Sequence, residues 1–309
     1  MHATGQVAAP RAARSTTSTL ALAIGVAVLS AGGCEGSTQD DTAGKRAAPE
    51  PTAGEETGNG ERAAQQTAQD EAAGPPASRS APEKASESRH AAWDAIVSSY
   101  ATDDGGFRYE ALRESTEDLA RLDGYLERVA GADASTLERD AELAFYINAY
   151  NALTVKAVLD AWPTESVMEV DGFFKEKKHA VAGREVTLDE LEHGIIREQF
   201  DEPRIHFAVN CASASCPPLA DEAYTAANLE RLLAAQTRAY VRESTEIDEG
   251  AGKVRVSKLF EWFEEDFADA GGVRAFVAER LPEGKAKKVR SDDLELVHRE
   301  YDWALNDRP

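Results

Sequence analysis

Two cysteines and one histidine offer the clearest route to chemistry in this chain. Ile205, Phe207 and Val209 alternate with more polar residues, which predicts a strand that carries His206 and ends near Asn210. The loop that follows holds Cys211 and Cys216. An imidazole within hydrogen-bond reach of a thiol favours the thiolate, which is the nucleophilic form. His206, Cys211 and Cys216 are therefore candidate catalytic residues.

The same two cysteines have a structural alternative. If the domain lies in an oxidising compartment, an even pair of cysteines favours a disulfide between Cys211 and Cys216. The ring would be small, so the bridge would contribute at most about 2 kcal/mol and would mainly fix the shape of the loop. A pair locked in a disulfide supplies no nucleophile, so the two hypotheses exclude each other unless the disulfide is itself redox-active.

Amide side chains on a long helix suggest a polar cleft beside this loop. Asn148 and Asn151 are three residues apart and so share one helical face, inside an otherwise apolar stretch. Buried amides need hydrogen-bond partners. They would either bind the polar group of a ligand or brace the backbone of the cysteine loop. Tyr150 and Asn210 are candidate ligand-binding residues with the same ambiguity.

Glu192 and His193 are the remaining candidates for ligand binding. With His179 and His206 they include the residue types of a zinc site. No pair has the i, i+4 helical spacing that would place two ligands on one face, so we predict no metal and no cofactor. Asp302 is a candidate for orienting a histidine, as the third member of a catalytic triad does.

Helices outnumber strands in the pattern that must position these residues. A capping-box spacing at Ser135 and Glu138 predicts the start of the longest helix, which Pro163 stops. That helix is apolar on most of its circumference and is expected to be buried. Around Ala182-Gly183 a hairpin is expected, and further short strands at 254–256 and 294–297. The predicted fold is α+β, with a small sheet packed against several helices in a single globular domain.

The first part of the chain has the features of an export signal. Arg11 and Arg14 precede a short apolar run, small residues and Cys34, which are the parts of a secretory signal peptide over residues 1–33. The ending on cysteine resembles a bacterial lipoprotein signal, and that resemblance implies lipidation of Cys34. We therefore expect an extracytoplasmic protein anchored to a bacterial membrane through Cys34. Glu35 favours the outer membrane.

Composition predicts a tether between the anchor and the domain. Residues 35–92 contain no Val, Ile, Leu, Met, Phe, Tyr or Trp, so this segment cannot bury enough apolar surface to offset its ordering entropy. We predict a disordered tether over 34–92 and a globular domain over 93–309. With 34 basic and 56 acidic residues, the net charge of −22 makes nucleic acid an improbable partner.

Six segments taken in order resemble the family known as domain of unknown function 547. The resemblance extends from about Trp93 to Asn306 and implies a domain associated with the bacterial envelope or secreted, with no defined reaction. The segments are Phe145-Tyr146-Ile147-Asn148-Ala149-Tyr150-Asn151-Ala152, Leu188-Asp189-Glu190-Leu191-Glu192-His193, Pro203-Arg204-Ile205-His206-Phe207-Ala208-Val209-Asn210-Cys211, Ala214-Ser215-Cys216-Pro217-Pro218-Leu219, Ser257-Lys258-Leu259-Phe260-Glu261-Trp262-Phe263 and Tyr301-Asp302-Trp303-Ala304-Leu305-Asn306.

Two functions from different classes follow from these residues. The first is a tethered binding module that holds an unknown envelope ligand or protein in a polar cleft around His206 and the Cys211–Cys216 loop. The alternative is a thiol-dependent hydrolase or transferase that uses Cys211 or Cys216 with His206. The chain contains no Gly-x-Ser-x-Gly elbow, no phosphate-binding glycine loop and no His-Glu-x-x-His motif. Whether the protein is an enzyme stays open at this point.

Overall fold

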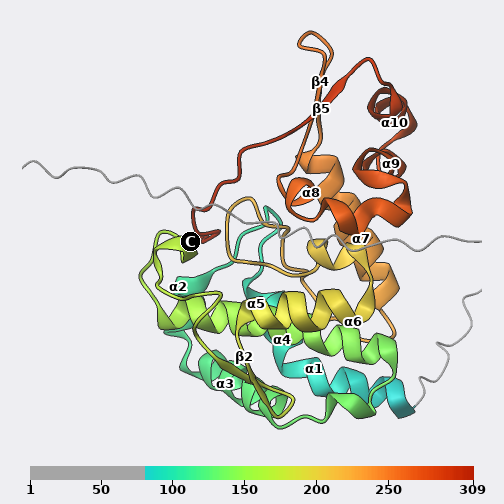
Figure 1. The fold of residues 1–309 in the computed structure, drawn as a ribbon. Coiled ribbons are helices and arrows are strands. Elements are labelled where there is room, and N and C mark those ends of the chain that lie inside the picture. The colour runs from blue at the N-terminus through green and yellow to red at the C-terminus, as the bar shows by residue number, and fades with distance from the viewer. Residues whose placement is uncertain (1–80) are drawn as a thin grey trace, which may run out of the picture. The chain divides into compact units, whose positions relative to one another are not determined.

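A computed structural model describes the chain from residue 81 to residue 309, and its side chains from residue 88. Figure 1 shows α1 to α6 and the β1–β2 hairpin in one half, and β4, β5 and α8 to α10 in the other. The helices are α1 (Ala81–Tyr100), α2 (Tyr109–Glu114), α3 (Thr116–Ala130), α4 (Arg139–Asp160), α5 (Leu188–Leu191), α6 (Glu198–Phe200), α7 (Leu229–Ser244), α8 (Leu259–Trp262), α9 (Gly272–Glu279) and α10 (Glu283–Arg290). The strands are β1 (His179–Val181), β2 (Arg184–Val186), β3 (Glu246–Asp248), β4 (Lys253–Val256) and β5 (Glu295–His298).

Shorter helical turns join these elements. They are the 3₁₀ turns η1 (Ala134–Thr136), η2 (Val167–Glu169), η4 (Pro203–Phe207) and η5 (Glu264–Ala270), and the π-helical turn η3 (Glu192–Arg197). The predicted α+β class is confirmed, with two small sheets in place of one. No helix within residues 81–309 has the length and apolarity needed to cross a membrane.

Helix α4 is the centre of the first core, as its apolar circumference predicted. From Leu143 to Leu159 every residue except Lys156 is buried. Helices α1, α2, α3 and α5 pack against it. The predicted start differs, because the Asp133 carboxylate accepts hydrogen bonds from the backbone and hydroxyl of Ser135 and so caps η1 instead. As a result α4 begins at Arg139.

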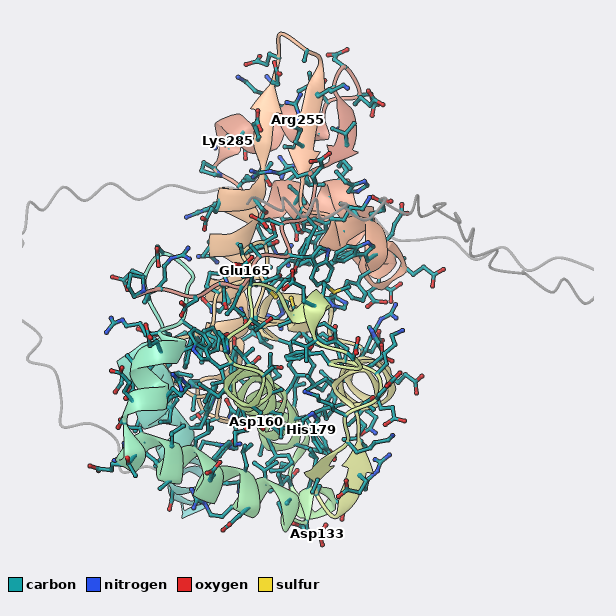
Figure 2. The ribbon with its side chains drawn as sticks, turned by 90° about the vertical axis from the view of Figure 1, so that its left-hand side faces the viewer. Asp133, Asp160, Glu165, His179, Arg255 and Lys285 are labelled. Atoms are coloured by element: carbon teal, nitrogen blue, oxygen red, sulfur yellow. The ribbon has the colours of Figure 1, made fainter. Side chains whose placement is uncertain are left out.

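A second core lies under the three-stranded sheet. Strand β4 pairs antiparallel with β3 and parallel with β5. A parallel pair needs a long crossover, which here contains α8, η5, α9 and α10. The crossover supplies most of the buried phenylalanines of this core, Phe260, Phe267 and Phe276. Figure 2 shows Arg255 of β4 and Lys285 of α10 toward one end, opposite Asp133 and His179.

The predicted hairpin at 179–187 is confirmed. Strands β1 and β2 pair antiparallel, and both turn residues, Ala182 and Gly183, have positive φ as a tight two-residue hairpin requires. The capping box of Thr187 and Glu190 starts α5 directly after the hairpin.

The predicted strand at 205–210 is wrong. Pro203 opens the 3₁₀ turn η4, and the Glu202 side chain caps it at the Arg204 backbone N–H. The residues from Ile205 to Asn210 are all buried, so the alternation of apolar and polar types did not mark an inner and an outer face. The turn joins the two cores, since Ile205 belongs to the first and Phe207 to the second. His206 is therefore held at their junction.

The predicted boundary of the tether is also wrong. Helix α1 begins at Ala81, so residues 81–92 are helical, although the chain there lacks large apolar side chains. His90 packs this segment against the core in place of a large apolar side chain. Its ring is buried, and Nδ1 lies 2.9 Å from the Tyr125 hydroxyl. Burial, with the nearby Arg89 charge, lowers the pKa of His90 to about 4, so the ring packs as a neutral group. The predicted signal peptide, Cys34 and the tether up to residue 80 lie outside the described residues.

Candidate functional site

A cavity of about 230 Å³ opens where the two cores meet. Its walls come from α4, the π-helical turn η3, η4 and the loop after it, α8 and the C-terminal segment. Most of the lining is apolar, and its aromatic members are Tyr150, Phe174, Trp262, Phe263, Tyr301 and Trp303. The polar members include Glu192, His193, His206, Cys211 and Cys216. The structure thus brings these five predicted residues and Tyr150 to one cavity.

The predicted disulfide is not present. Cys211 and Cys216 are free, and their sulfurs lie 2.9 Å apart, against about 2.05 Å for a disulfide bond. The pair makes a hydrogen-bonded contact. The Cys211 backbone N–H also donates to the Cys216 sulfur at 2.9 Å. Cys211 is partly exposed and Cys216 is buried.

Hydrogen-bond donors surround the Cys211 sulfur. Besides the Cys216 thiol, the Ser213 hydroxyl lies 3.1 Å from it and the Tyr301 hydroxyl 3.3 Å. The contact with the Cys216 thiol is the main cause that lowers the pKa of Cys211 to about 7, with Ser213 and Tyr301 adding to it against the opposing effect of burial. Burial and the contact with Cys211 raise the pKa of Cys216 well above its ordinary value. Near neutral pH, a substantial fraction of Cys211 is therefore thiolate, while Cys216 remains a thiol.

The loop that carries the two thiols is held by side-chain and backbone contacts. Asn210 accepts a hydrogen bond from the Ala212 backbone N–H at 2.8 Å and donates to the Pro217 carbonyl at 2.7 Å. The Ala212 carbonyl accepts from the Asn306 backbone N–H at 3.0 Å. Ala212 has φ of +64°, a strained conformation for a residue with a Cβ, and it lies directly between Cys211 and Ser213.

Asn148 and Asn151 do not line the cavity, so the expected polar cleft of amides is wrong. Asn151 donates to the Ala208 carbonyl at 2.9 Å and accepts from the Asn210 backbone N–H at 2.8 Å. Asn148 makes the same pair of contacts with the carbonyl and N–H of Tyr224. Both ends of each amide are occupied by backbone. Asn151 therefore braces the backbone that enters the cysteine loop, as the alternative expected, whereas Asn148 braces the separate segment at Tyr224. Asn210 likewise binds only its own loop and does not line the cavity.

His206 is fixed by an acid that the sequence did not single out. Its Nε2 lies 2.7 Å from Asp266 Oδ2, and Arg197 donates two hydrogen bonds to the same carboxylate, each 2.6 Å long. Burial opposes ionisation of Asp266, but the hydrogen bonds from His206 and Arg197 outweigh it and lower the pKa of that carboxyl. The ring stacks on Phe263 with 3.9 Å between centroids. It is only 2% exposed, and Nδ1 has no hydrogen-bond partner among the described residues.

Glu192 and His193 begin the π-helical turn η3, a local widening that often accompanies functional sites. His193 Nε2 lies 3.8 Å from Asp189 Oδ1, and its ring is 5.9 Å from that of Phe263. Tyr150 comes from α4 and is buried. Burial raises its pKa well above the ordinary value, and the nearby Glu192 carboxylate adds to this, so Tyr150 is a neutral hydroxyl.

Sequence reasoning missed the second half of the cavity. Asp266 contacts His206, Ser213 contacts Cys211, and Arg197 binds Asp266. Tyr301, Trp262 and Trp303 form an aromatic cluster with centroids 4.6 to 5.8 Å apart. Asp302, the acid that the sequence suggested for a histidine, is exposed and accepts a hydrogen bond from the Ala304 backbone instead. One signal was available in the sequence, because the segment from Leu259 to Phe267 is rich in aromatic residues.

Metal ligands do not gather in the part of the chain from residue 81 onward. No group of three or more His, Cys, Asp or Glu side chains there is placed to hold an ion. His179, which the sequence analysis considered with Glu192 and His193, lies on β1 and does not line the cavity.

The fold and site define an α+β domain with an aromatic cavity that is lined by two free cysteines and a carboxylate-bound histidine. Residues 134–241 match the model of a family described as "Protein of unknown function, DUF547", which confirms the resemblance for this segment. The matched segment is narrower than the range from Trp93 to Asn306. It contains both cysteines and His206 but ends before Asp266 and the aromatic cluster. No significant match was found among curated proteins or solved structures.

Removing the Asn151 amide is expected to destabilise the domain strongly. Asn151→Ala leaves the Asn210 N–H and the Ala208 carbonyl buried without partners, which lowers the free energy of unfolding by about 3 kcal/mol. Thr154→Val is the matched control, because Thr154 lies on the same helix, is equally buried and has a hydroxyl without a partner. It changes that free energy by less than about 1 kcal/mol. Urea unfolding compares the two, and equal losses would show that Asn151 does not brace the loop.

Proposed function

We propose that this domain binds a small organic ligand in the cavity beside His206 and the Cys211–Cys216 loop. The observation that carries the proposal is the cavity itself, an apolar hollow with a few polar groups converging on it, which is the usual make-up of small-molecule sites. Two side chains at this cavity are conspicuously exposed for their type, Met168 at 59% and Trp262 at 43%. Exposed apolar surface of this kind is typical of binding sites.

The polar groups suggest what the ligand carries. Glu192 and the neutral hydroxyl of Tyr150 lie near each other, and the Cys211 sulfur lies among three polar groups, from Ser213, Cys216 and Tyr301. The cavity has an aromatic wall and a separate group of polar side chains, so it suits a ligand with a flat or apolar body and one polar group. Its body would lie against Trp262, Phe263 and Trp303, and its polar group would face the thiolate.

A neutral apolar fluorophore tests the binding proposal. N-phenylnaphthylamine is expected to bind the full chain with enhanced fluorescence, and Trp262→Ala weakens binding about tenfold because one aromatic wall is lost. Trp162→Ala is the control, since the same side chain is removed at a position that does not line the cavity. Binding that is unchanged in Trp262→Ala, or lost equally in both variants, would place the probe elsewhere and reject the proposal.

A second function is favoured by the surroundings of Cys211. A thiolate at neutral pH, open to a cavity, can form a covalent bond to an electrophilic substrate, as in a thiol-dependent hydrolase or transferase. His206 supports this role through its position. His206 lines the same cavity as Cys211, and Asp266 holds its Nε2, which leaves Nδ1 as the ring nitrogen that would accept a proton; Nδ1 is buried and bonds to neither sulfur. This function adds covalent chemistry to the binding proposed above.

Alkylation kinetics test the second function. In a full chain carrying Cys34→Ser, the rate of Cys211 modification by iodoacetamide rises with pH as the thiolate forms, and is half-maximal near pH 7. Cys216→Ala and Tyr301→Phe each remove a donor, so the midpoint moves up by about one pH unit. In Tyr240→Phe it stays in place, because the Tyr240 hydroxyl contacts Ser215 and Ser257 and neither sulfur. A midpoint near the pH of an ordinary thiol in the parent chain would reject an activated Cys211.

We also propose that the domain is displayed outside the cytoplasm on a lipid anchor. The support is the order of parts at the start of the sequence: Arg11 and Arg14, a short apolar run, small residues and Cys34. A lipid there would hold the domain at a bacterial membrane, with Glu35 favouring the outer one, near an envelope ligand or protein. Metabolic labelling of the full chain with a fatty acid in a bacterial host tests this. Label that persists in Cys34→Ser, or that is absent from both chains, would contradict the anchor.

A further inference from the structure

We propose that Cys211 and Cys216 form a dithiol–disulfide couple that reduces a substrate disulfide bound in the aromatic cavity. The inference deepens the second function above, since it rests on Cys211 as the attacking sulfur, and it names the substrate class as a disulfide. It rests on the short distance between the Cys211 and Cys216 sulfurs. Neither the binding proposal nor a hydrolase mechanism requires two sulfurs so close together.

The two sulfurs are close enough for bond formation. They lie 2.9 Å apart, and a disulfide needs about 2.05 Å, so a small side-chain movement closes the bond. The backbone between them already turns back on itself, because the Cys216 N–H donates to the Ser213 carbonyl at 3.0 Å. Packing of a buried cysteine in the core does not require a second sulfur at this distance, so the proximity of the two sulfurs favours a role in bond formation.

Exposure divides the roles between the two sulfurs. Cys211 is partly exposed at the cavity, while Cys216 lines the same cavity but is buried, with only 8% of its surface exposed. An attacking sulfur must meet the substrate, whereas a resolving sulfur only has to meet the mixed disulfide. The arrangement therefore assigns attack to Cys211 and resolution to Cys216.

The surrounding frame keeps the pair in this relation. Ser215 donates its backbone N–H to the Asp302 carbonyl, and its hydroxyl accepts from the Asp302 N–H at 2.9 Å. Ala214 donates to the Ala304 carbonyl at 2.7 Å. The C-terminal segment thus fixes the middle of the cysteine loop, and Asn210 fixes its two ends. The sulfurs can change their bonding while the backbone around them stays in place.

The reaction balances over two exchanges. The Cys211 thiolate bonds to one sulfur of the substrate disulfide, the substrate S–S bond breaks, and the leaving thiolate takes the proton of Cys216. The Cys216 thiolate then bonds to Cys211 Sγ, the mixed disulfide breaks, and the second substrate thiolate takes a proton from water. The substrate disulfide is reduced by two electrons, and the cysteine pair is oxidised by two. Two equivalents of an external thiol then reduce the Cys211–Cys216 disulfide to the dithiol and are themselves oxidised to a disulfide.

Reaction with dithiobis(nitrobenzoate), an aromatic disulfide, tests the couple. In an anaerobic full chain carrying Cys34→Ser, we expect two nitrothiophenolates released per chain, and a final mass that has lost two hydrogen atoms and carries no label. Adding Cys216→Ser leaves one release and a stable mixed disulfide on Cys211. Adding Cys211→Ser slows the reaction at least tenfold, because only the buried sulfur remains. Circular dichroism checks that each variant is folded.

Two outcomes would overturn the inference, and they separate it from the function on which it rests. If the parent chain keeps the label and forms no internal disulfide, the couple is rejected, although rapid alkylation of Cys211 would still support a nucleophile. If Cys211 reacts with neither iodoacetamide nor the aromatic disulfide, both the couple and the second function fail. Release of two equivalents from the Cys216→Ser chain would also reject Cys216 as the resolving sulfur.

Discussion

The rest of the site depends on the way helix α4 supports an irregular stretch of buried backbone. From Ala208 to Ala212 the chain is mostly buried yet forms no helix or strand, so its N–H and C=O groups lack regular partners. Burying such groups unpaired would cost more than the packing gains. Asn151 pairs one carbonyl and one N–H there, and Asn148 does the same near Tyr224. Two amides inside an apolar helix thus permit a non-regular loop to cross the core.

The irregular backbone of this loop has a chemical consequence. An irregular backbone can place Cys211, Ser213 and Cys216 around one point, which a strand or helix would separate. The C-terminal segment adds Tyr301 to the same point. The resulting cluster of donors stabilises negative charge on Cys211, and the strain at Ala212 is retained because contacts on both sides hold the loop. The bracing of the loop by α4 and the reactivity of the Cys211 thiol are therefore linked, because the first allows the loop shape on which the second depends.

The junction of the two cores explains why the cavity lies where it does. His206 is the single residue between Ile205 of one core and Phe207 of the other, and Asp266 with Arg197 holds it across the boundary. The aromatic cluster of Trp262, Tyr301 and Trp303 follows the cysteine loop in the chain and packs beside it. The match to the DUF547 family covers residues 134–241, which include the loop but not the cluster.

The sequence by itself determined the α+β class, the buried central helix, the β1–β2 hairpin and the set of candidate residues His206, Cys211, Cys216, Tyr150, Glu192 and His193. These follow from local signals, namely periodicity, capping pairs, turn residues and residue chemistry. Only the tertiary structure decided that the segment around His206 is a 3₁₀ turn, that the thiols are free, that Asn148 and Asn151 bind backbone, and that Asp266 holds the histidine. The contacts of Asn148, Asn151 and Asp266 depend on which groups meet across the fold: Asn151 lies 57 positions from Ala208, and Asp266 lies 60 from His206. Spacing along a chain carries no information on such distant pairs, whose geometry is set by packing.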